Sequence, residues 1–491
     1  MGIIRSQALN NSVVSYLGII IGYLNLAILF PRLLSQEVLG LVQVLVAAML
    51  FTSNLGSFGL QYIVVRYFPI FRNKAFDTRT FFSFAFTLSV GFILISSLIL
   101  FTFRASVKAF YTEKAELFAD YYYLLFPLLV FGILSILLDS YSRAIMKSVL
   151  TATYKEVVLR ILQLCSVLLF YFELLSLDQF LWLYVLTQGA YVIIMYIAVG
   201  KHSDIKFNFN FKPIKKPFLK DIFKYGGISM FSTTSLLANN SDVLLVGTFV
   251  GLEATAIYSV ASAIGRVIGV PSRSLVRVAT SVVAEAWSTN DTGRIERVYK
   301  KSAFNNLITG GVLFLLVAIN TPLFLSLIPE SYAAAEPVIV ILALSKIVQT
   351  ASGIGSSIIS SSRDYRVNMI VNTLSFAALL GLSYLFISIF GMIGAAYGTF
   401  LTMFMSNMAK YLFLKTKYKL EPFSMSFLWI VVLLTSIYFI DFALPHLDHL
   451  VIDSIARSII LTGFYVVIIY KSNWSSDFNE LIEEQILNRI K

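Results

Sequence analysis

ASAIGRVIGVPSRSLVRVAT, residues 261–280, lies at the centre of an apolar run over residues 254–283. The run is long enough to cross a bilayer as one helix. At about 100° per residue, one narrow stripe collects its arginines and hydroxyl side chains: Thr255, Ser259, Ser262, Arg266, Arg273, Arg277 and Thr280. The opposite face carries branched apolar side chains: Ile257, Ile264, Ile268, Leu275 and Val282. The pattern predicts a membrane helix with one wet face.

The arginines of this run indicate what the wet face meets. An arginine near mid-bilayer costs about 2.5–3.5 kcal/mol on insertion scales when it meets lipid. Three on one stripe therefore favour a polar cavity that holds an anion; the alternative is that they pair with carboxylates where helices pack, but few acidic partners are present. Pro271 should bend the helix, and Gly265 and Gly269 should admit a close neighbour.

The composition places the whole chain in a membrane. Of its 491 residues 58% are hydrophobic and 13% charged, and the mean hydropathy is +0.80, far from the average of soluble proteins. About fourteen runs reach the ~20 residues that a bilayer requires. They are residues 10–30, 38–64, 80–103, 121–145, 151–172, 180–200, 225–250, 254–283, 302–327, 337–359, 369–390, 392–413, 425–444 and 455–470.

The distribution of basic residues predicts the orientation. With a cytoplasmic N-terminus, 29 of the 38 Lys and Arg residues fall in inward connections, 5 in outward connections and 4 within spans. This bias predicts that both termini are cytoplasmic. It also makes the net charge of +11 a matter of topology and anionic headgroups, not of nucleic-acid binding. The single cysteine, Cys165, excludes a disulfide framework and a cysteine metal site.

A weak internal repeat divides the chain. Shifted by 216 residues, 36–41 overlie 252–257; shifted by 210, Pro127 overlies Pro337. With equal numbers of spans on each side of a basic loop, the repeat predicts two six-helix bundles of the same orientation. We therefore expect an all-α polytopic membrane protein divided into a first bundle (1–200), a cytoplasmic linker (201–224), a second bundle (225–417), two further helices (418–470) and an amphipathic tail (471–491).

Three segments carry a family resemblance: SYLGIIIGYLNLAILFPRLLSQEVLGLVQ (15–43), ESYAAAEPVIVILALSKIVQTASGIGSSIISSSRDYR (330–366) and FGMIGAAYGTFLTM (390–403). They resemble polysaccharide and O-antigen flippases of the multidrug/oligosaccharidyl-lipid/polysaccharide (MOP) exporter superfamily, in pattern from about Gly2 to Lys417. YAAAEP and GMIGAAYGT are the more specific parts, and none of these is a catalytic signature.

The resemblance implies a V-shaped, two-bundle transporter of the bacterial cytoplasmic membrane. It would move an oligosaccharide linked to undecaprenyl diphosphate to the outer leaflet by alternating access. The product would serve lipopolysaccharide O-antigen, capsule or exopolysaccharide.

Candidate substrate-binding residues lie in both halves. In the first half, one face at helical spacing carries Gln43, Asn54, Ser57 and Gln61. When the internal repeat is aligned with its shift of 216 residues, Ser57 falls on Arg273 and Gln61 on Arg277. Guanidinium groups suit a diphosphate, whereas amides and hydroxyls suit sugars. The neutral residues could equally satisfy one another where helices pack. We expect Lys346, about 14 Å deep in its span, to be a fourth cation.

The remaining charged candidates have simpler alternatives. Asp242, beside Asn239, could bind a coupling sodium ion or proton, or could neutralise an arginine. Asp139 and Arg143, four residues apart, are expected to pair with each other. His446, Asp448 and His449 lie in an outward loop that we expect to be solvated and not metal-binding.

Three classes of function fit a polytopic protein. A lipid-linked oligosaccharide flippase needs a cationic cavity and no catalytic group, as here. A cation-coupled multidrug antiporter of the same superfamily should carry an acidic cavity, and a membrane glycan polymerase or ligase should carry a large outward loop with reactive residues. We therefore expect a monomeric transporter, not an enzyme, without a cofactor. Its expected partners are the lipid-linked oligosaccharide and membrane lipids, with the polymerase and chain-length proteins of the pathway as further candidates.

Overall fold

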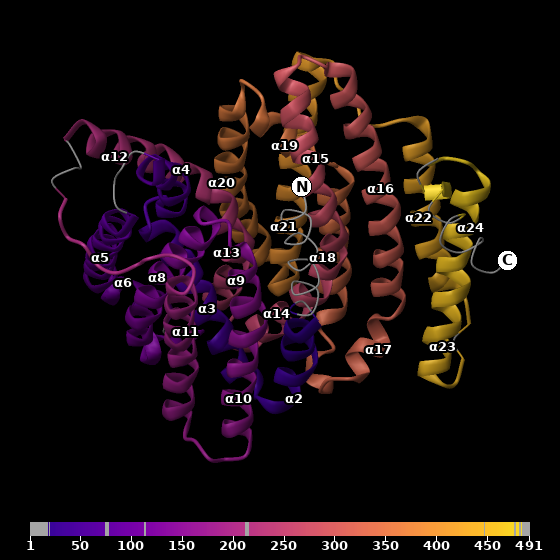
Figure 1. Cartoon of the computed structure of the whole chain (residues 1–491). Helices are drawn as coiled ribbons and strands as arrows, with labels where there is room; N and C mark the ends of the chain where they lie inside the picture. The colour runs from indigo at the N-terminus through magenta and orange to yellow at the C-terminus, as the bar shows by residue number, and fades with distance from the viewer. Residues whose placement is uncertain are drawn as a thin grey trace. The chain divides into compact units, whose positions relative to one another are not determined.

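The computed structural model describes residue 18 and residues 20–73, 78–111, 114–211, 216–445, 447–475, 478–480 and 483 (Figure 1). These residues form helices and no β-strand. Nine of the described helices are long and apolar enough to cross a membrane, or ten if one bent pair counts as a span. The all-α, multi-pass membrane fold is confirmed.

The chain divides into two compact units, Met1–Ser259 and Val260–Lys491. The helices of the first unit are η1 (Leu24–Leu29), α2 (Phe30–Leu33), α3 (Gln36–Gly56), α4 (Leu60–Asn73), α5 (Thr78–Thr102), α6 (Arg104–Tyr111), α7 (Glu116–Asp120), η2 (Tyr121–Leu124), α8 (Leu125–Ala144), α9 (Ser148–Thr153), η3 (Tyr154–Val158), α10 (Leu159–Tyr171), α11 (Leu177–Gly200), α12 (Lys216–Met230), η4 (Phe231–Thr233) and α13 (Thr234–Phe249).

The boundary between the units falls inside α14 (Leu252–Arg266). The second unit continues with η5 (Val267–Gly269), α15 (Val270–Ser288), α16 (Thr292–Ile319), α17 (Thr321–Ser326), η6 (Glu330–Tyr332), α18 (Ala335–Ala351), α19 (Gly355–Ser361), α20 (Tyr365–Phe390), α21 (Met392–Phe413), η7 (Leu414–Tyr418), α22 (Met425–Ala443), α23 (Leu450–Arg457), η8 (Ser458–Thr462) and α24 (Gly463–Lys471).

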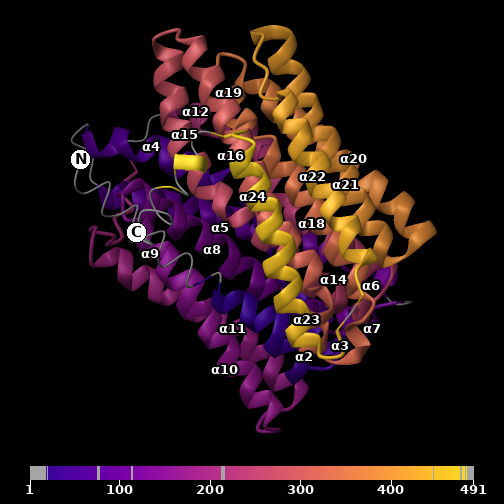
Figure 2. The ribbon, with the colours of Figure 1, turned by 90° about the vertical axis from the view of Figure 1, so that its right-hand side faces the viewer.

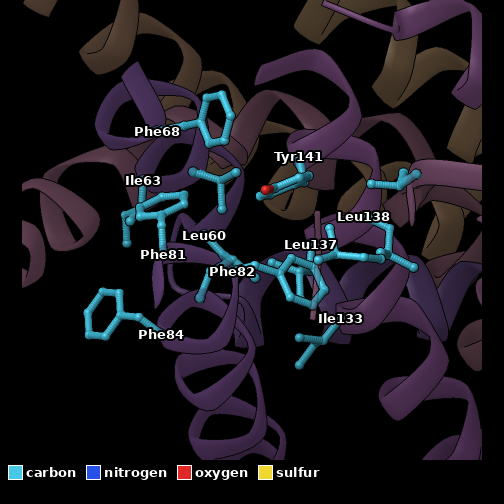
Figure 3. Packing of buried hydrophobic residues seen from close by; sticks show 14 of the residues in the cluster. Leu60, Ile63, Phe68, Phe81, Phe82, Phe84, Ile133, Leu137, Leu138 and Tyr141 are labelled. Carbon is cyan, nitrogen blue, oxygen red and sulfur yellow. The ribbon is translucent and has the colours of Figure 1, made fainter. Parts of the chain in front are cut away.

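Aromatic and branched side chains of α4, α5 and α8 form a large part of one hydrophobic core cluster of the first unit (Figure 3). The ring of Tyr141 lies edge-on to both Phe68 and Phe82, with 5.2 Å between ring centroids in each pair. Leu60 and Ile133 are fully buried beside them. Between membrane helices such van der Waals packing, and not transfer out of water, supplies most of the stabilisation.

The first helices after the basic loop, α12 and α13, belong to the first unit and pack on its earlier helices. α13 lies against α3, and α12 lies against α4, where the Tyr67 hydroxyl donates to Asp221 at 2.6 Å. Gly40 of α3 lets the backbone approach closely, since a Cβ there would stand 1.9 Å from the carbonyl oxygen of Leu252. The contacts thus divide the chain at Ser259, whereas the repeat divides it at 201–224. The repeat-based domains stay a prediction.

In the second unit α18 packs on α16 and α21, and α20 runs beside α21 (Figure 2). α18 and α19 form the bent pair, with an angle of 46° between them. The bend contains Gly353 at φ +61°, a conformation that glycine adopts without strain. The two further helices that the sequence predicts are α22 and the continuous rod α23–η8–α24, and both pack on α16.

Several predicted features lie outside the described residues. They are His446, the side chain of Asn239, and most of the predicted amphipathic tail, including Leu481, Ile482, Ile486 and Ile490.

Candidate substrate-binding site

The predicted arginine helix is two α-helices joined by a 3-10 turn. α14 ends at Arg266, η5 covers Val267–Gly269, and Pro271 stands in the first turn of α15. Proline has no N–H to donate and fits this position. Pro271 therefore follows an interruption of the α-helix, whereas the expected bend stays a prediction, because Leu252–Ser288 counts as one candidate span. A 3-10 turn advances about 120° per residue, so three residues displace the stripe of α15 by about 60° from that of α14.

The two glycines of this region differ. A Cβ at Gly265 would lie 3.3 Å from the Ala343 nitrogen and from the Leu342 Cβ of α18, so the expected close neighbour is present. At Gly269 no described atom lies within 4 Å of such a Cβ, and the expectation is wrong there. Gly265 fixes the end of α14 against α18.

α15 has a buried face and a polar exposed face. Ala279, Val283 and Ala286 are buried in a cluster with residues of α16 and α19. The exposed side chains follow one another at helical spacing: Arg273, Arg277, Val278, Ser281, Ala284, Glu285 and Ser288. Packing of the apolar face thus orients both arginines away from the core of their own unit.

The three arginines differ in their partners. The Arg266 Nε donates to the Ser262 carbonyl oxygen at 3.2 Å, and the side chain is half-exposed. Within the described parts of the chain, Arg273 and Arg277 form no ion pair. Two guanidinium groups on a membrane-length helix therefore have no carboxylate partner among the residues that the structure describes.

Lys346 lies on α18 in the same unit and is half-exposed. Its ammonium donates to the Gln349 Oε1 at 3.1 Å. The amide oxygen accepts this bond and holds the ammonium near Gln349.

The neutral wall predicted in the first unit is interrupted. α3 ends at Gly56, Phe58 and Gly59 have positive φ values of +48° and +72°, and α4 begins at Leu60. Gln61 is therefore not on a continuous helical face with Asn54 and Ser57, so the predicted common face is wrong in this respect. A hydrophobic pattern does not reveal a break of three residues.

The neutral side chains themselves have different environments. The Asn54 Nδ2 donates to the Leu50 carbonyl at 2.7 Å, and the Ser57 Oγ to the Asn54 carbonyl at 3.0 Å. These two are satisfied by their own helix. Gln43 is half-buried, and the Gln61 Nε2 is buried without a hydrogen-bond partner among the described residues. Gln61 is the member of the set with an open donor.

Asp242 is buried in α13, with 6% of its surface exposed. Its Oδ2 accepts from the Tyr258 hydroxyl of α14 at 2.9 Å, and its Oδ1 from the Val243 N–H at 2.9 Å. These bonds place the carboxylate where α13 meets α14 in the first unit. The role of Asp242 in binding a coupling ion stays a prediction.

The expected ion pair between Asp139 and Arg143 does not form. Its carboxylate accepts from the buried Tyr191 hydroxyl and lies 3.3 Å from the Lys155 ammonium, whereas Arg143 is exposed. Spacing along one helix favoured Arg143, but α11 and η3 bring other partners to the same carboxylate.

No three His, Cys, Asp or Glu side chains of the described residues form a group that could hold a metal ion.

The sequence analysis missed one charged residue of this unit. Lys410 lies within α21, and its ammonium donates to the Ser356 Oγ of α19 at 3.0 Å. The two lysines that follow it pair with acids instead. Hydrogen bonds from Lys417 lower the pKa of Asp364, and hydrogen bonds from Lys415 lower the pKa of Glu421. The absence of an acidic residue three or four positions from Lys410 is a signal that the sequence did contain.

Comparison with protein families gives one match. A family model described as "Polysaccharide biosynthesis protein" matches residues 29–335, more than half of the chain. Comparison with curated proteins gave no match.

Solved structures with this fold are transporters. The lipid II flippase MurJ in an inward closed conformation is 16% identical with a TM-score of 0.70, over 94% of this chain and 99% of that one. An inward-facing multidrug resistance MATE family transporter of the MOP superfamily is 16% identical with a TM-score of 0.63, over 83% and 98%. A MOP superfamily transporter from Pyrococcus furiosus, described as having a binding pocket of reverse polarity, is 16% identical with a TM-score of 0.53, over 84% and 95%. The fold is that of MOP superfamily transporters.

Proposed function

This chain belongs to the polysaccharide biosynthesis protein family, and we propose that it is a flippase for a lipid-linked oligosaccharide. The carrier is undecaprenyl diphosphate, and the direction is from the inner to the outer leaflet of the bacterial cytoplasmic membrane. The glycan serves a surface polysaccharide such as O-antigen, capsule or exopolysaccharide.

One observation carries the proposal: Arg273 and Arg277 are exposed on a membrane-length helix and form no ion pair with the described residues. Two uncompensated guanidinium groups are costly against lipid, so an aqueous path with an anionic cargo explains them best. The diphosphate supplies that anion, because each guanidinium can form two parallel charge-assisted hydrogen bonds with its oxygens.

The residues of the site take different parts in transport. Arg266 lies about 18 Å along its helix from the outer end, near mid-depth, and holds the diphosphate there. Arg273, Arg277 and Lys346 extend the positive potential along the path. Gln43 and Gln61 offer amides to sugar hydroxyls. The chain performs no bond chemistry, and binding followed by alternating access moves the cargo.

The multidrug antiporter is the second candidate, because MATE transporters share the fold. It requires acidic side chains accessible to an organic cation. Asp139 and Asp242 are instead buried and accept hydrogen bonds from tyrosines. A binding pocket of reverse polarity is described for the Pyrococcus furiosus transporter, so the polarity of the pocket differs among transporters of this fold.

Export in a flippase-deficient strain tests the proposal. Arg266→Ala, Arg273→Ala and Arg277→Ala should each reduce export strongly, Arg→Lys should retain part of it, and Arg→Glu should be worst because it repels phosphate. The control is Arg294→Ala, which removes an exposed arginine paired with Glu285 and should leave export unchanged. Full export by Arg266→Glu and Arg273→Glu, at equal protein levels on a blot, would rule out a phosphate-binding role.

We further propose that Asp242, with Asn239 beside it in sequence, binds the coupling sodium ion or proton. Asp242→Asn should then abolish the dependence of transport on the ion gradient while substrate binding persists. The control is Tyr258→Phe, which removes one hydrogen bond to the carboxylate and keeps its charge. Unchanged ion dependence in Asp242→Asn would contradict the coupling role.

A further inference from the structure

A polar cluster lies on α19 and α21 of the second unit, apart from the arginines. α19 buries Ile358 and Ile359 and exposes Ser356 and Ser360, one helical turn apart. The Lys410 ammonium donates to the Ser356 Oγ at 3.0 Å. We call Lys410, Ser356, Ser360 and Asn368 the lysine–serine cluster.

Lys410 has unused hydrogen-bonding capacity. A lysine ammonium carries three donors, and the bond to Ser356 uses one of them. In the described residues no carboxylate lies within ion-pair distance of Lys410. Two donors of the ammonium are therefore available to a ligand, and no carboxylate among the described residues competes for them.

The neighbouring lysines show that this lack of a partner is specific to Lys410. Lys415 lies 2.6 Å from the Glu421 carboxylate, and Lys417 lies 2.6 Å from that of Asp364. The acidic groups nearest in the chain are thus occupied by other lysines. The cluster therefore consists of an ammonium, serine hydroxyls and an amide. Such groups donate hydrogen bonds to phosphate esters.

Asn368 of α20 adds an open acceptor to the cluster. Its Nδ2 donates to the Ser360 Oγ at 2.7 Å, whereas its Oδ1 is buried with no partner among the described residues. A buried amide oxygen without a donor is unfavourable, and a ligand hydroxyl would satisfy it. The cluster thus offers donors for a phosphate and an acceptor for a sugar hydroxyl.

Hydroxyl side chains connect this cluster to the arginine helix. The Thr280 Oγ1 of α15 lies 3.0 Å from the Ser357 Oγ of α19. Thr280 is three residues beyond Arg277, and Ser357 follows Ser356. Residues three apart on a helix are neighbours on its surface, so Arg277 and Thr280 lie on the same side of α15, and Thr280 contacts α19 at the residue that follows Ser356.

We infer that the lysine–serine cluster is a second binding subsite for a glycosyl phosphate ester, the diphosphate of the carrier lipid, in addition to Arg277 and Arg273. The identity of the ligand rests on the proposed function. Lys410 supplies the charge, Ser356 and Ser360 donate to phosphate oxygens, and Asn368 accepts from the first sugar.

Binding to the full-length protein in phosphatidylcholine nanodiscs tests the inference. The probes are undecaprenyl diphosphate and, for the charge requirement, undecaprenol. Lys410→Met should weaken diphosphate binding about tenfold, the loss expected for one charge-assisted hydrogen bond, whereas Lys410→Arg should retain most of it. The matched control is Lys415→Met, which removes a lysine five residues away and should bind like the wild type.

Each outcome decides one question. If Lys410→Met binds the diphosphate like the wild type while Arg273→Ala binds it weakly, the subsite is wrong and the proposed function stands. If the wild type binds undecaprenol as tightly as the diphosphate, the proposed function itself fails. If phosphatidylglycerol displaces the diphosphate from wild type but not from Lys410→Met, the cluster is a headgroup site and the substrate subsite is overturned. Should Lys410→Met fail to fold, Lys410→Gln keeps the bond to Ser356 without the charge and gives the same reading.

Discussion

Two regions of the second unit use arginine in opposite ways. The α22–α23 hairpin buries Arg457, whose side chain is 7% exposed, and faces outward with large apolar side chains such as Phe439 and Phe442. α15 buries its apolar face and exposes Arg273 and Arg277. The share of buried residues is nevertheless the same, 18% for the span that includes α15 and 17% for α22. The two spans therefore bury equal shares of their residues but differ in the kind of side chain that they expose.

The partners of the arginines explain the difference. Arg457 donates to the carboxylates of Asp441 and Asp453 and to the carbonyls of Asp441, Leu444 and Pro445. All its donors serve the connection between α22 and α23. A guanidinium that is fully used by the protein is structural, whereas one that the protein leaves open is available to a ligand.

Removing the buried arginine should have the largest effect on stability. Arg457→Ala leaves Asp453, which is 5% exposed, without its cation, and such a loss costs about 3–5 kcal/mol. Arg273→Ala should change stability little because it breaks no ion pair. Thermal unfolding in detergent measures both. Equal melting temperatures for the two variants would erase the distinction between structural and open arginines.

A new arginine should distinguish the two exposed faces. Phe439 of α22 and Val278 of α15 are 64% and 68% exposed. Phe439→Arg places a charge against lipid and should cost about 2.5–3.5 kcal/mol, whereas Val278→Arg enters a wet face and should be tolerated. The amount of folded protein in the membrane is the measurement. Similar losses in both variants would mean that α15 also faces lipid.

Thiol labelling compares the same two faces without a change of charge. In a Cys165→Ala background, single cysteines replace Ser281 of α15 and Ser436 of α22, both of which are exposed. Reaction requires the thiolate and hence water, so a small water-soluble reagent should modify Ser281→Cys much faster. Equal rates would argue against an aqueous path along α15.

An exposed ion pair should have the smallest effect. Hydrogen bonds from Lys417 and Tyr418 hold the pKa of Asp364 below its ordinary value. A lowered carboxyl pKa means that the stabilisation is complete at neutral pH and is lost as pH falls below about 3.9 toward the lower folded value. Asp364→Asn should remove this part of the acid dependence of unfolding and alter stability at pH 7 only slightly. A large loss at pH 7 would show that the pair is not merely a surface contact.

The membrane class and the approximate spans could be predicted from the amino-acid sequence alone. Hydrophobic length and helical periodicity are local properties, and each predicted run from residue 38 onward is mostly helical in the described parts of the chain, with breaks at 57–59 and 352–354. The sequence also identified Arg273 and Arg277, because a charge within an apolar run is conspicuous without any knowledge of its neighbours.

Which charged side chains have partners became clear from the packing of the helices. Asp139 found Tyr191 and Lys155 instead of Arg143, and Gln61 was separated from Asn54 by a break whose positive φ values no hydrophobic pattern reveals. Arg457 donates hydrogen bonds to the carbonyls of Leu444 and Pro445 in a turn, whereas Lys410 donates to the hydroxyl of one serine. Hydrogen bonding depends on atoms that are distant in sequence and near in space, and so the open cations of this protein could be recognised only after its helices were packed.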